Sequence, residues 1–249
     1  MAKTAFITGA SSGFGLECAR SLARQDYKII ALARRKDRLE SLEAEFKGQI
    51  HTVKADVRDK EAIFKAVEDL PSEFQDITVL LNNAGLSLGL DEFDKLDIED
   101  IDTMVDTNVK GFLYVARAVL PLMRKQKSAH IFNLSSVAAD TAYFGGNVYC
   151  GTKAFVRQFS RALRNDLRGA NIKVTSIAPG LCKTEFSEVR FKGDKKRADN
   201  VYRDTKFLSA QDIAAVICAL ISLPDHINVN EIELMPVTQS WAGFYTERL

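Results

Sequence analysis

Seven short apolar runs, separated by amphipathic stretches along the 249-residue chain, constrain its fold more than any other feature. Most runs are nearly continuously apolar, as expected for strands that helices cover on both faces. Repeated strand–helix alternation favours a parallel sheet with right-handed crossovers. We therefore predict an α/β fold, a doubly wound parallel sheet of about seven strands. The predicted strands are Ala5–Thr8, Lys28–Ala33, Gln49–Lys54, Thr78–Asn82, Ala129–Leu134, Lys173–Ala178 and Glu231–Leu234.

The chain has the length of one large α/β domain and contains no Gly/Ser linker, low-complexity tract or internal repeat. We therefore predict that residues 1–249 form a single domain, which must then provide any ligand-binding and catalytic sites itself. One composition break, residues 181–206, is polar and rich in Lys, Arg and Asp. Ligands of such sheets bind beyond the carboxyl ends of the strands, so this segment is predicted to cover the substrate. A plain linker is the alternative.

Charge and termini exclude several classes of protein. With 34 Lys and Arg against 33 Asp and Glu, the net charge is +1, without the broad positive field of a nucleic-acid-binding protein. The longest apolar run, Ile213–Ile221, is far shorter than the roughly 20 residues needed to cross a membrane. The N-terminus lacks a secretory signal, so a cytoplasmic location is expected. The four cysteines and three histidines are scattered, and no metal site is expected.

A glycine-rich turn, Thr8–Gly15, follows the first predicted strand and opens a helix that runs to about Arg24. Glycines allow a tight turn and a close backbone approach, and a helix N-terminus offers N–H groups and partial positive charge to a pyrophosphate. A glycine-rich turn without a ligand is the alternative. The predicted phosphate-binding residues are Gly9, Ser11, Ser12, Gly13, Phe14 and Gly15.

The end of the second predicted strand indicates which dinucleotide is bound. Sheets that bind NAD place a carboxylate there, about 20 residues after the glycines, whereas this chain has Arg34 and Arg35. A planar guanidinium suits a phosphate, so both arginines predict NADP(H). A basic, solvent-facing first turn of the next helix is the alternative, and we expect it for Lys36 and Arg38. The ends of the third and fourth strands should add Asp56, Val57, Asn83, Ala84 and Gly85 to the cofactor surface.

Tyr149 and Lys153 are four residues apart and lie on one face of a predicted helix. A free tyrosine has a pKa near 10, and a cation within about 4–6 Å lowers it. Such a pair can exchange a proton while a hydride moves. The spacing alone is weak evidence, but Ser136 precedes Tyr149 by thirteen positions and Asn108 lies on an earlier amphipathic helix. Ser135, the neighbour of Ser136, is the alternative.

Together with Thr8–Gly15 and Asn82–Gly85, these residues resemble the short-chain dehydrogenase/reductase family over essentially the whole chain. The resemblance implies a Rossmann-type fold, a homotetramer built on the helices that carry Asn108 and Tyr149, and a catalytic tetrad. In such a tetrad Tyr149 is the acid/base, and Ser136 holds the substrate oxygen beside it. Lys153 binds the nicotinamide ribose and lowers the Tyr149 pKa, and Asn108 orders a water. The family pattern also places Pro179, Gly180, Leu181 and Thr184 against the cofactor.

Three further segments, Gly145–Tyr149, Thr184–Asp194 and Met235–Ser240, resemble the NADP-dependent 3-hydroxy acid dehydrogenases, also called serine or L-allo-threonine dehydrogenases. This resemblance implies hydride transfer at the 3-hydroxyl of short 3-hydroxy acids such as serine, allo-threonine or 3-hydroxypropionate, or reduction of malonic semialdehyde. A desolvated carboxylate needs a cation, and we expect Arg190 to supply it, with Lys192 also within reach. A surface charge on a loop is the alternative for Arg190.

Other functions remain open from the residues alone. A general carbonyl or 3-oxoacyl reductase of the same family is the main alternative. A non-catalytic dinucleotide-binding regulatory module is less favoured because the tetrad is intact. An isomerase or epimerase that keeps its dinucleotide bound usually carries a larger C-terminal domain.

Overall fold

A computed structural model describes residues 3–241 and contains a seven-stranded sheet in the order β3-β2-β1-β4-β5-β6-β7. Every neighbouring pair of strands is parallel, so the predicted fold class is confirmed. The strands are β1 Thr4–Thr8, β2 Lys28–Ala33, β3 Ile50–Lys54, β4 Ile77–Asn82, β5 Ala129–Leu134, β6 Ile172–Pro179 and β7 Glu231–Leu234. Each coincides with a predicted strand to within one residue at either end.

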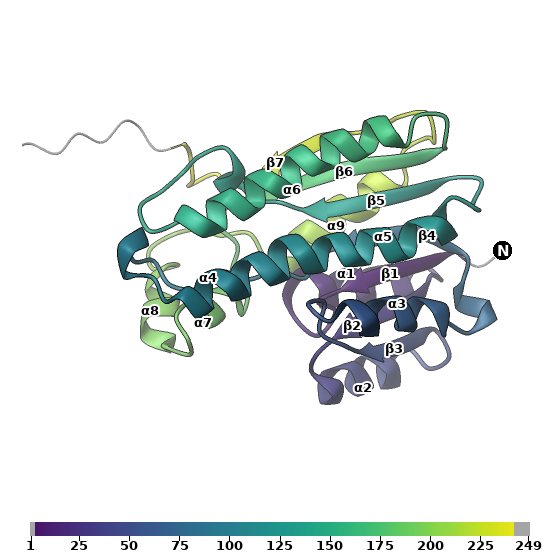
Figure 1. Ribbon diagram of the computed structural model, residues 1–249, viewed down its shortest axis with the longest axis horizontal. Coiled ribbons are helices and arrows are strands. Elements are labelled where there is room, and N and C mark those ends of the chain that lie inside the picture. The colour runs from purple at the N-terminus through teal and green to yellow at the C-terminus, as the bar shows by residue number, and fades with distance from the viewer. Residues whose placement is uncertain (1–2, 242–249) are drawn as a thin grey trace, which may run out of the picture.

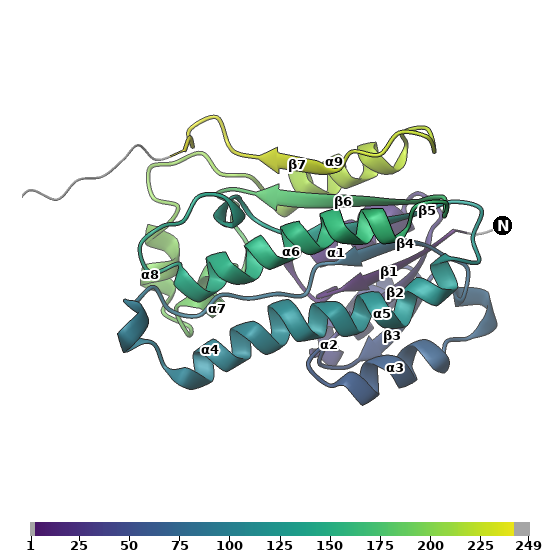
Figure 2. The same cartoon turned by 45° about the horizontal axis from the view of Figure 1, so that its top comes forward.

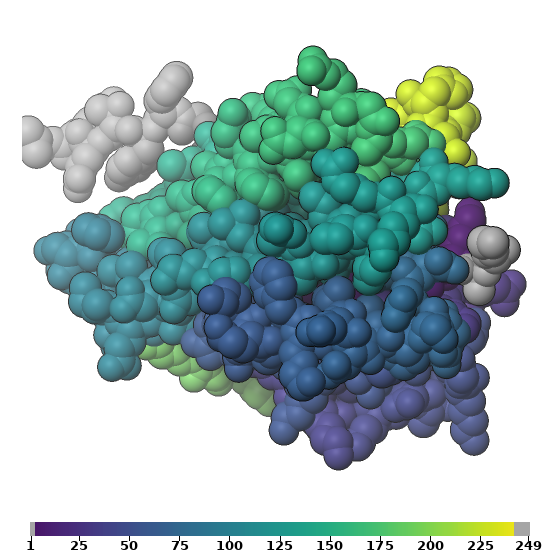
Figure 3. Space-filling view, turned by 45° about the vertical axis from the view of Figure 1, so that its right-hand side comes forward, coloured from purple at the N-terminus to yellow at the C-terminus, as the bar shows by residue number. Residues whose placement is uncertain are grey.

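Helices cover both faces of the sheet (Figures 1 and 2). One layer comprises α1 Gly13–Ala23, α2 Lys36–Glu45 and α9 Ala210–Ile221. The opposite layer comprises α3 Lys60–Glu68, α5 Phe112–Met123 and α6 Asn147–Asp166. In Figure 3 the side chains of the blue segment around α3 lie directly against those of the teal segment around α5.

The two layers explain why the strands read as continuous apolar runs. Neighbouring residues of β1 are both fully buried, but Ile7 packs in the core with α1 and α9 while Phe6 packs in the core with α3 and α5. Because successive side chains point to opposite faces, apolar residues are favoured at consecutive positions of a strand that is covered on both faces.

Three short helices lie beyond the carboxyl ends of the strands: α4 Ile98–Val105, α7 Phe186–Arg190 and α8 Lys195–Asn200 (Figure 1). The last two belong to the predicted covering segment. Its two ends are fastened together, because the Lys183 N–H donates to the Leu208 carbonyl and the Leu208 N–H donates to the Leu181 carbonyl, both at 2.9 Å. We call residues 184–207, which lie between these ties, the covering loop.

Within residues 3–241, none of the helices combines the length and the apolar character needed to span a membrane. The last residues of the chain, 242–249, lie outside the described residues.

Candidate active site

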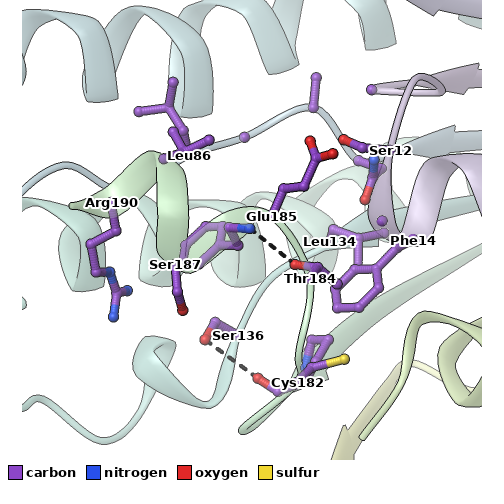
Figure 4. Close-up of a pocket in the computed structure, with 18 of the residues that line it drawn as sticks. Ser12, Phe14, Leu86, Leu134, Ser136, Cys182, Thr184, Glu185, Ser187 and Arg190 are labelled. Atoms are coloured by element: carbon purple, nitrogen blue, oxygen red, sulfur yellow. Dashed lines mark hydrogen bonds between the residues drawn. The ribbon is translucent and has the colours of Figure 1, made fainter. Parts of the chain in front are cut away.

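A cavity of about 470 Å³ opens where the carboxyl ends of the central strands meet the covering loop. The residues predicted to bind a cofactor line it, with the exception of Gly15. Figure 4 shows Ser12 and Phe14 on one side of this cavity and Arg190 on the opposite side, with Ser136 and Thr184 between them. The sequence segments singled out for cofactor and substrate therefore meet in one place.

The glycine turn is packed too closely for side chains. A Cβ on Gly9, whose φ is +67°, would lie 2.7 Å from the Asn83 side-chain nitrogen, and a Cβ on Gly15 would lie 2.8 Å from the Gly9 carbonyl carbon. Ser12 precedes α1 without a side-chain capping bond, which leaves the helix N-terminus to another acceptor. Gly13 and Phe14 bring this N-terminus to the cavity wall. The turn therefore fits a pyrophosphate.

Arginine side chains border the same turn. Arg35 donates to both Ser11 and Ser12 hydroxyl oxygens, at 3.1 and 2.7 Å, and pairs with Glu185 at 2.8 Å. Arg34 is more exposed and lies 3.9 Å from an Asp56 carboxylate oxygen. These guanidinium groups and hydroxyls form a set of donors that fits a phosphate.

Lys36 and Arg38 differ from one another. Lys36 is 68% exposed and pairs with Glu40 one turn along α2, as a solvent-facing residue would. Arg38, expected to face solvent as well, instead forms an ion pair with Glu185 of the covering loop. The Arg38 side chain is still about two-fifths exposed, but its ion pair could not be predicted because its partner is 147 positions away.

Tyr149 and Lys153 come from the first two turns of α6 and are almost fully buried. Burial raises the pKa of Tyr149 to about 12, and the hydrogen bond with the Ser136 hydroxyl and the charge of Arg190 oppose this shift. Burial also lowers the pKa of Lys153 to about 8. The Lys153 ammonium lies 5.8 Å from the centre of the Tyr149 ring and donates to the Leu134 carbonyl at 2.7 Å.

The two serines at the end of β5 have different surroundings. The Ser135 hydroxyl donates to the Lys153 carbonyl at 3.0 Å, so it is occupied in holding α6. The Ser136 hydroxyl accepts from the Ala138 N–H at 3.1 Å, lies a long 3.5 Å from the Pro179 carbonyl and is hydrogen-bonded to Tyr149. Ser136 is therefore the hydroxyl that remains available beside Tyr149.

Asn108 lies behind the cavity wall. The sequence predicted that it lies on a regular amphipathic helix, but the structure differs. It belongs to a π-helical stretch, Asp106–Gly111, between α4 and α5, a local widening often found at functional sites. Its side chain accepts from the Leu86 N–H at 2.9 Å and donates to the Leu86 carbonyl and the Thr152 hydroxyl. A Cβ on Gly85 would touch both Asn108 and Lys153, so these two side chains meet around that glycine.

Arg190 ends α7 with its guanidinium among aromatic rings. Its central carbon lies 5.0 Å from the Phe186 ring, 5.4 Å from Tyr149 and 5.8 Å from Tyr143. One terminal nitrogen donates to the Tyr143 hydroxyl at 3.0 Å. Its Nε is buried and has no partner among the described residues. Lys192, the other candidate cation, pairs with Asp100 at 2.7 Å and does not line the cavity.

The cavity lining also includes residues that were not among the predicted site residues, among them the polar residues Tyr143, Glu185 and Gln239. Gln239 accepts from the Leu181 N–H at 2.6 Å, which fixes the backbone that follows β6. Glu185 and Gln239 belong to the segments Thr184–Asp194 and Met235–Ser240, which resemble the 3-hydroxy acid dehydrogenases. This resemblance could have indicated that both residues lie at the site. Among residues 3–241 no three His, Cys, Asp or Glu side chains gather as metal ligands would.

The arrangement can perform a defined chemistry. A hydroxyl and a phenol meet at one point of the cavity, with a buried ammonium behind them and a guanidinium beside them. Such groups can hold an alcohol or carbonyl oxygen and exchange a proton with it. The elongated cavity connects this point to the glycine turn and to the arginines that border it.

Comparisons with known proteins agree with this geometry. The family model for short chain dehydrogenases matches residues 3–195. Serine 3-dehydrogenase of Agrobacterium fabrum is 48% identical over 248 residues, covering 100% of this chain and 99% of that protein. NADP-dependent 3-hydroxy acid dehydrogenase YdfG of Salmonella typhi is 48% identical over 243 residues, covering 97% of this chain and 98% of the relative. A closed form of serine dehydrogenase complexed with NADP⁺ is 45% identical with a TM-score of 0.97, covering 99% of this chain and 100% of that chain. A cavity of this chemistry, on this sheet, with these relatives, places the chain in the short-chain dehydrogenase family.

Proposed function

We propose that the protein is an NADP-dependent dehydrogenase that oxidises the 3-hydroxyl of short 3-hydroxy acids and reduces the matching semialdehydes. The observation that carries this substrate class is Arg190, whose guanidinium lies 5.4 Å from the Tyr149 ring with a buried Nε that has no partner among the described residues. A partly buried guanidinium with spare donors favours a carboxylate. The two relatives named for serine and for 3-hydroxy acids support the same class.

The choice of NADP(H) rests on the arginines that follow β2. Arg35 holds the Ser11 and Ser12 hydroxyls in place and presents a planar fork at the adenosine end of the cavity. A 2′-phosphate suits these donors better than a ribose hydroxyl does. The relatives described as NADP-dependent or complexed with NADP⁺ support this assignment.

The remaining cofactor contacts are proposed from their places along the cavity. The N-terminus of α1, with Gly9, Gly13 and Thr184 around it, would receive the pyrophosphate. Beyond it, the backbone of Pro179–Leu181 would flank the carboxamide and Lys153 would contact the nicotinamide ribose. The adenine would lie against Asp56, whose carboxylate oxygen is 3.9 Å from Arg34.

The proposed reaction moves one proton through Tyr149. When bound, the nicotinamide supplies the hydride acceptor in oxidation and the hydride donor in reduction. Ser136 and Tyr149 hold the substrate oxygen, and Tyr149 takes the hydroxyl proton in oxidation or gives its own proton in reduction. Because burial raises the pKa of Tyr149 to about 12, its phenol carries a proton at neutral pH and is ready to donate in the reductive direction.

Arg190 and Lys153 are cations that lie close to the Tyr149 ring, at 5.4 and 5.8 Å from its centre. The Arg190 charge lowers the Tyr149 pKa and so helps the phenol to release its proton. Lys153 lies 5.8 Å from the ring centre, and its pKa of about 8 leaves it mostly protonated at pH 7. We propose that the Lys153 ammonium favours the phenolate during oxidation and that Asn108 orders a water behind it.

A panel of substrates tests the function directly. NADP⁺ reduction is measured with L-serine, D-serine, L-allo-threonine, 3-hydroxypropionate and 3-hydroxyisobutyrate, and repeated with NAD⁺. The proposal expects turnover with several of these acids and a clear preference for NADP⁺. Activity confined to bulky ketones or acyl thioesters would contradict it and favour a carbonyl or 3-oxoacyl reductase. Tight NADPH binding without turnover of any substrate would favour a regulatory module.

The homotetramer and the cytoplasmic location stay predictions. On α5, one of the helices on which the tetramer was expected to be built, the apolar residues Phe112, Val115 and Val119 are buried inside the chain. Phe155 and Phe159 of α6 are partly exposed and stack on each other at 5.9 Å, so this face remains available to a second copy. Light scattering after size-exclusion chromatography measures the number of subunits.

A further inference from the structure

We propose that Glu185 is an internal competitor for the site that receives the 2′-phosphate of the cofactor. Its carboxylate holds Arg35 and Arg38 until a phosphate displaces it, and it thereby limits how tightly a phosphorylated dinucleotide is bound. This inference deepens the proposed function and rests on its NADP assignment.

Arg35 contacts both serines of the glycine turn and Glu185. Its Nε and Nη2 donate to the Ser11 hydroxyl, Nη2 donates also to Ser12, and Nη1 pairs with Glu185 at 2.8 Å. Arg38 pairs with the other Glu185 oxygen. One carboxylate thus joins the two guanidinium groups that border the glycine turn. Hydrogen bonds from Arg38 and Arg35 hold the pKa of Glu185 below its usual value despite partial burial, so it is an anion at neutral pH.

Glu185 is a residue of the covering loop, far from Arg35 along the chain. It directly precedes α7 in the covering loop, next to Thr184, and comes from a segment 150 positions away from Arg35. Figure 4 shows its side chain extended toward Ser12, on the side of the cavity away from Arg190. The Glu185 contacts therefore tie the loop to the adenosine end of the cavity.

Electrostatic repulsion between anions favours the replacement of Glu185 by a phosphate. A phosphate monoester carries about −1.5 to −2 charges and three strong acceptor oxygens, and it seeks the same donors as the carboxylate. Two anions on one guanidinium repel each other, so the phosphate replaces Glu185. The pairs are easily exchanged because their side chains remain about two-fifths exposed, and exposed ion pairs contribute little to stability. A ligand without a 2′-phosphate gains nothing from the exchange.

Binding of fragments tests the competition without any turnover. Calorimetry measures the affinity of adenosine 2′,5′-bisphosphate and of 5′-AMP for the full chain, for Glu185→Gln and for Glu188→Gln. Glu188 is the matched control, since it is an exposed glutamate of the same helix and forms no ion pair in the described structure. Glu185→Gln should bind the bisphosphate about threefold to tenfold more tightly, because two exposed ion pairs no longer compete. Its affinity for 5′-AMP should not change, and Glu188→Gln should match the unaltered protein.

Two results would overturn the inference. Weaker binding of the bisphosphate by Glu185→Gln would show that Glu185 holds the ligand in place. Equal binding by both variants would show that the ion pairs do not oppose the ligand. If the NADP assignment itself is wrong, the unaltered protein will bind adenosine 2′,5′-bisphosphate and 5′-AMP equally well. That result would overturn the inference as well. Circular dichroism of each variant establishes that the fold is retained.

Discussion

Replacing Arg190 by methionine should separate substrates with a carboxylate from those without one. Methionine keeps much of the aliphatic volume between the Phe186 and Tyr149 rings but removes the charge and all donors of the guanidinium. If Arg190 binds the substrate carboxylate, the variant loses that bond in both the ground state and the transition state. Its KM for a 3-hydroxy acid should therefore rise more than its kcat falls.

The structure sets the size of the effect. A hydrogen bond to a charged group contributes about 1.5–3 kcal/mol, and a guanidinium can offer a carboxylate two of them. Because Arg190 is only partly buried, the lower half of that range applies, about 3–4 kcal/mol in total for two bonds. At 1.4 kcal/mol per tenfold, kcat/KM for 3-hydroxypropionate should fall by about 10²- to 10³-fold.

The assay compares two substrates of similar size. Initial rates of NADP⁺ reduction are measured with 3-hydroxypropionate and with 1-propanol, in which a methyl group replaces the carboxylate. The alcohol reports any effect that passes through Tyr149, whose pKa the Arg190 charge lowers, and its kcat/KM should fall by less than about tenfold. Arg197→Met is the matched control, because that guanidinium also stacks on a ring of the covering loop, 4.5 Å from the Phe191 centre. An equal loss with both substrates, or no loss with the acid, would refute the role of Arg190.

Three further variants test the other groups. Tyr149→Phe should lower kcat by about 10²- to 10⁴-fold while NADPH binding persists in a fluorescence titration; unchanged turnover would rule out Tyr149 as the acid/base. Arg35→Met should weaken NADPH binding by about 10²-fold but NADH binding by less than about threefold, and equal losses for both would contradict phosphate recognition. Burial lowers the pKa of Lys153 from 10.5 to about 8, so between these values the unfolded chain binds more protons than the folded one. The free energy of unfolding, relative to Lys153→Met, should thus rise by about 3 kcal/mol from pH 7 to 11 in urea titrations, and a constant difference would contradict it.

The sheet could be predicted because strands that are buried on both faces appear in the sequence as nearly continuous apolar runs. The predicted bounds of β2, Lys28–Ala33, and of β5, Ala129–Leu134, coincide with the strands at both ends. The π-helical stretch Asp106–Gly111 could not be predicted, because an extra residue in a helix changes which side chains face the core without changing their composition. The helices α7 and α8 have five and six residues, too few to show a helical period.

Within the site, contacts between residues close in the sequence could be predicted, whereas contacts between distant residues could not. Tyr149 and Lys153 lie one helical turn apart, so their spacing alone predicted a shared face. Glu185 and Arg35 are 150 positions apart, and each stands in a charged stretch typical of a solvated surface. Arg190 and Tyr143 meet across 47 positions. Such pairs come together only when the chain folds, so short-range patterns in the sequence do not indicate their contacts.

The tied ends of the covering loop have a consequence for how enzymes of this architecture diversify. Because Leu181 and Lys183 are bonded to Leu208, the 24 residues between them leave and rejoin the body at nearly the same point. Closing such a loop costs only about 0.6 kcal/mol more for each doubling of its length. Insertions, deletions or a whole replacement segment can therefore be accepted there without disturbing β6 or α9. Substrate preference can then evolve, or be transplanted between relatives, while the catalytic residues on the sheet and α6 stay unchanged.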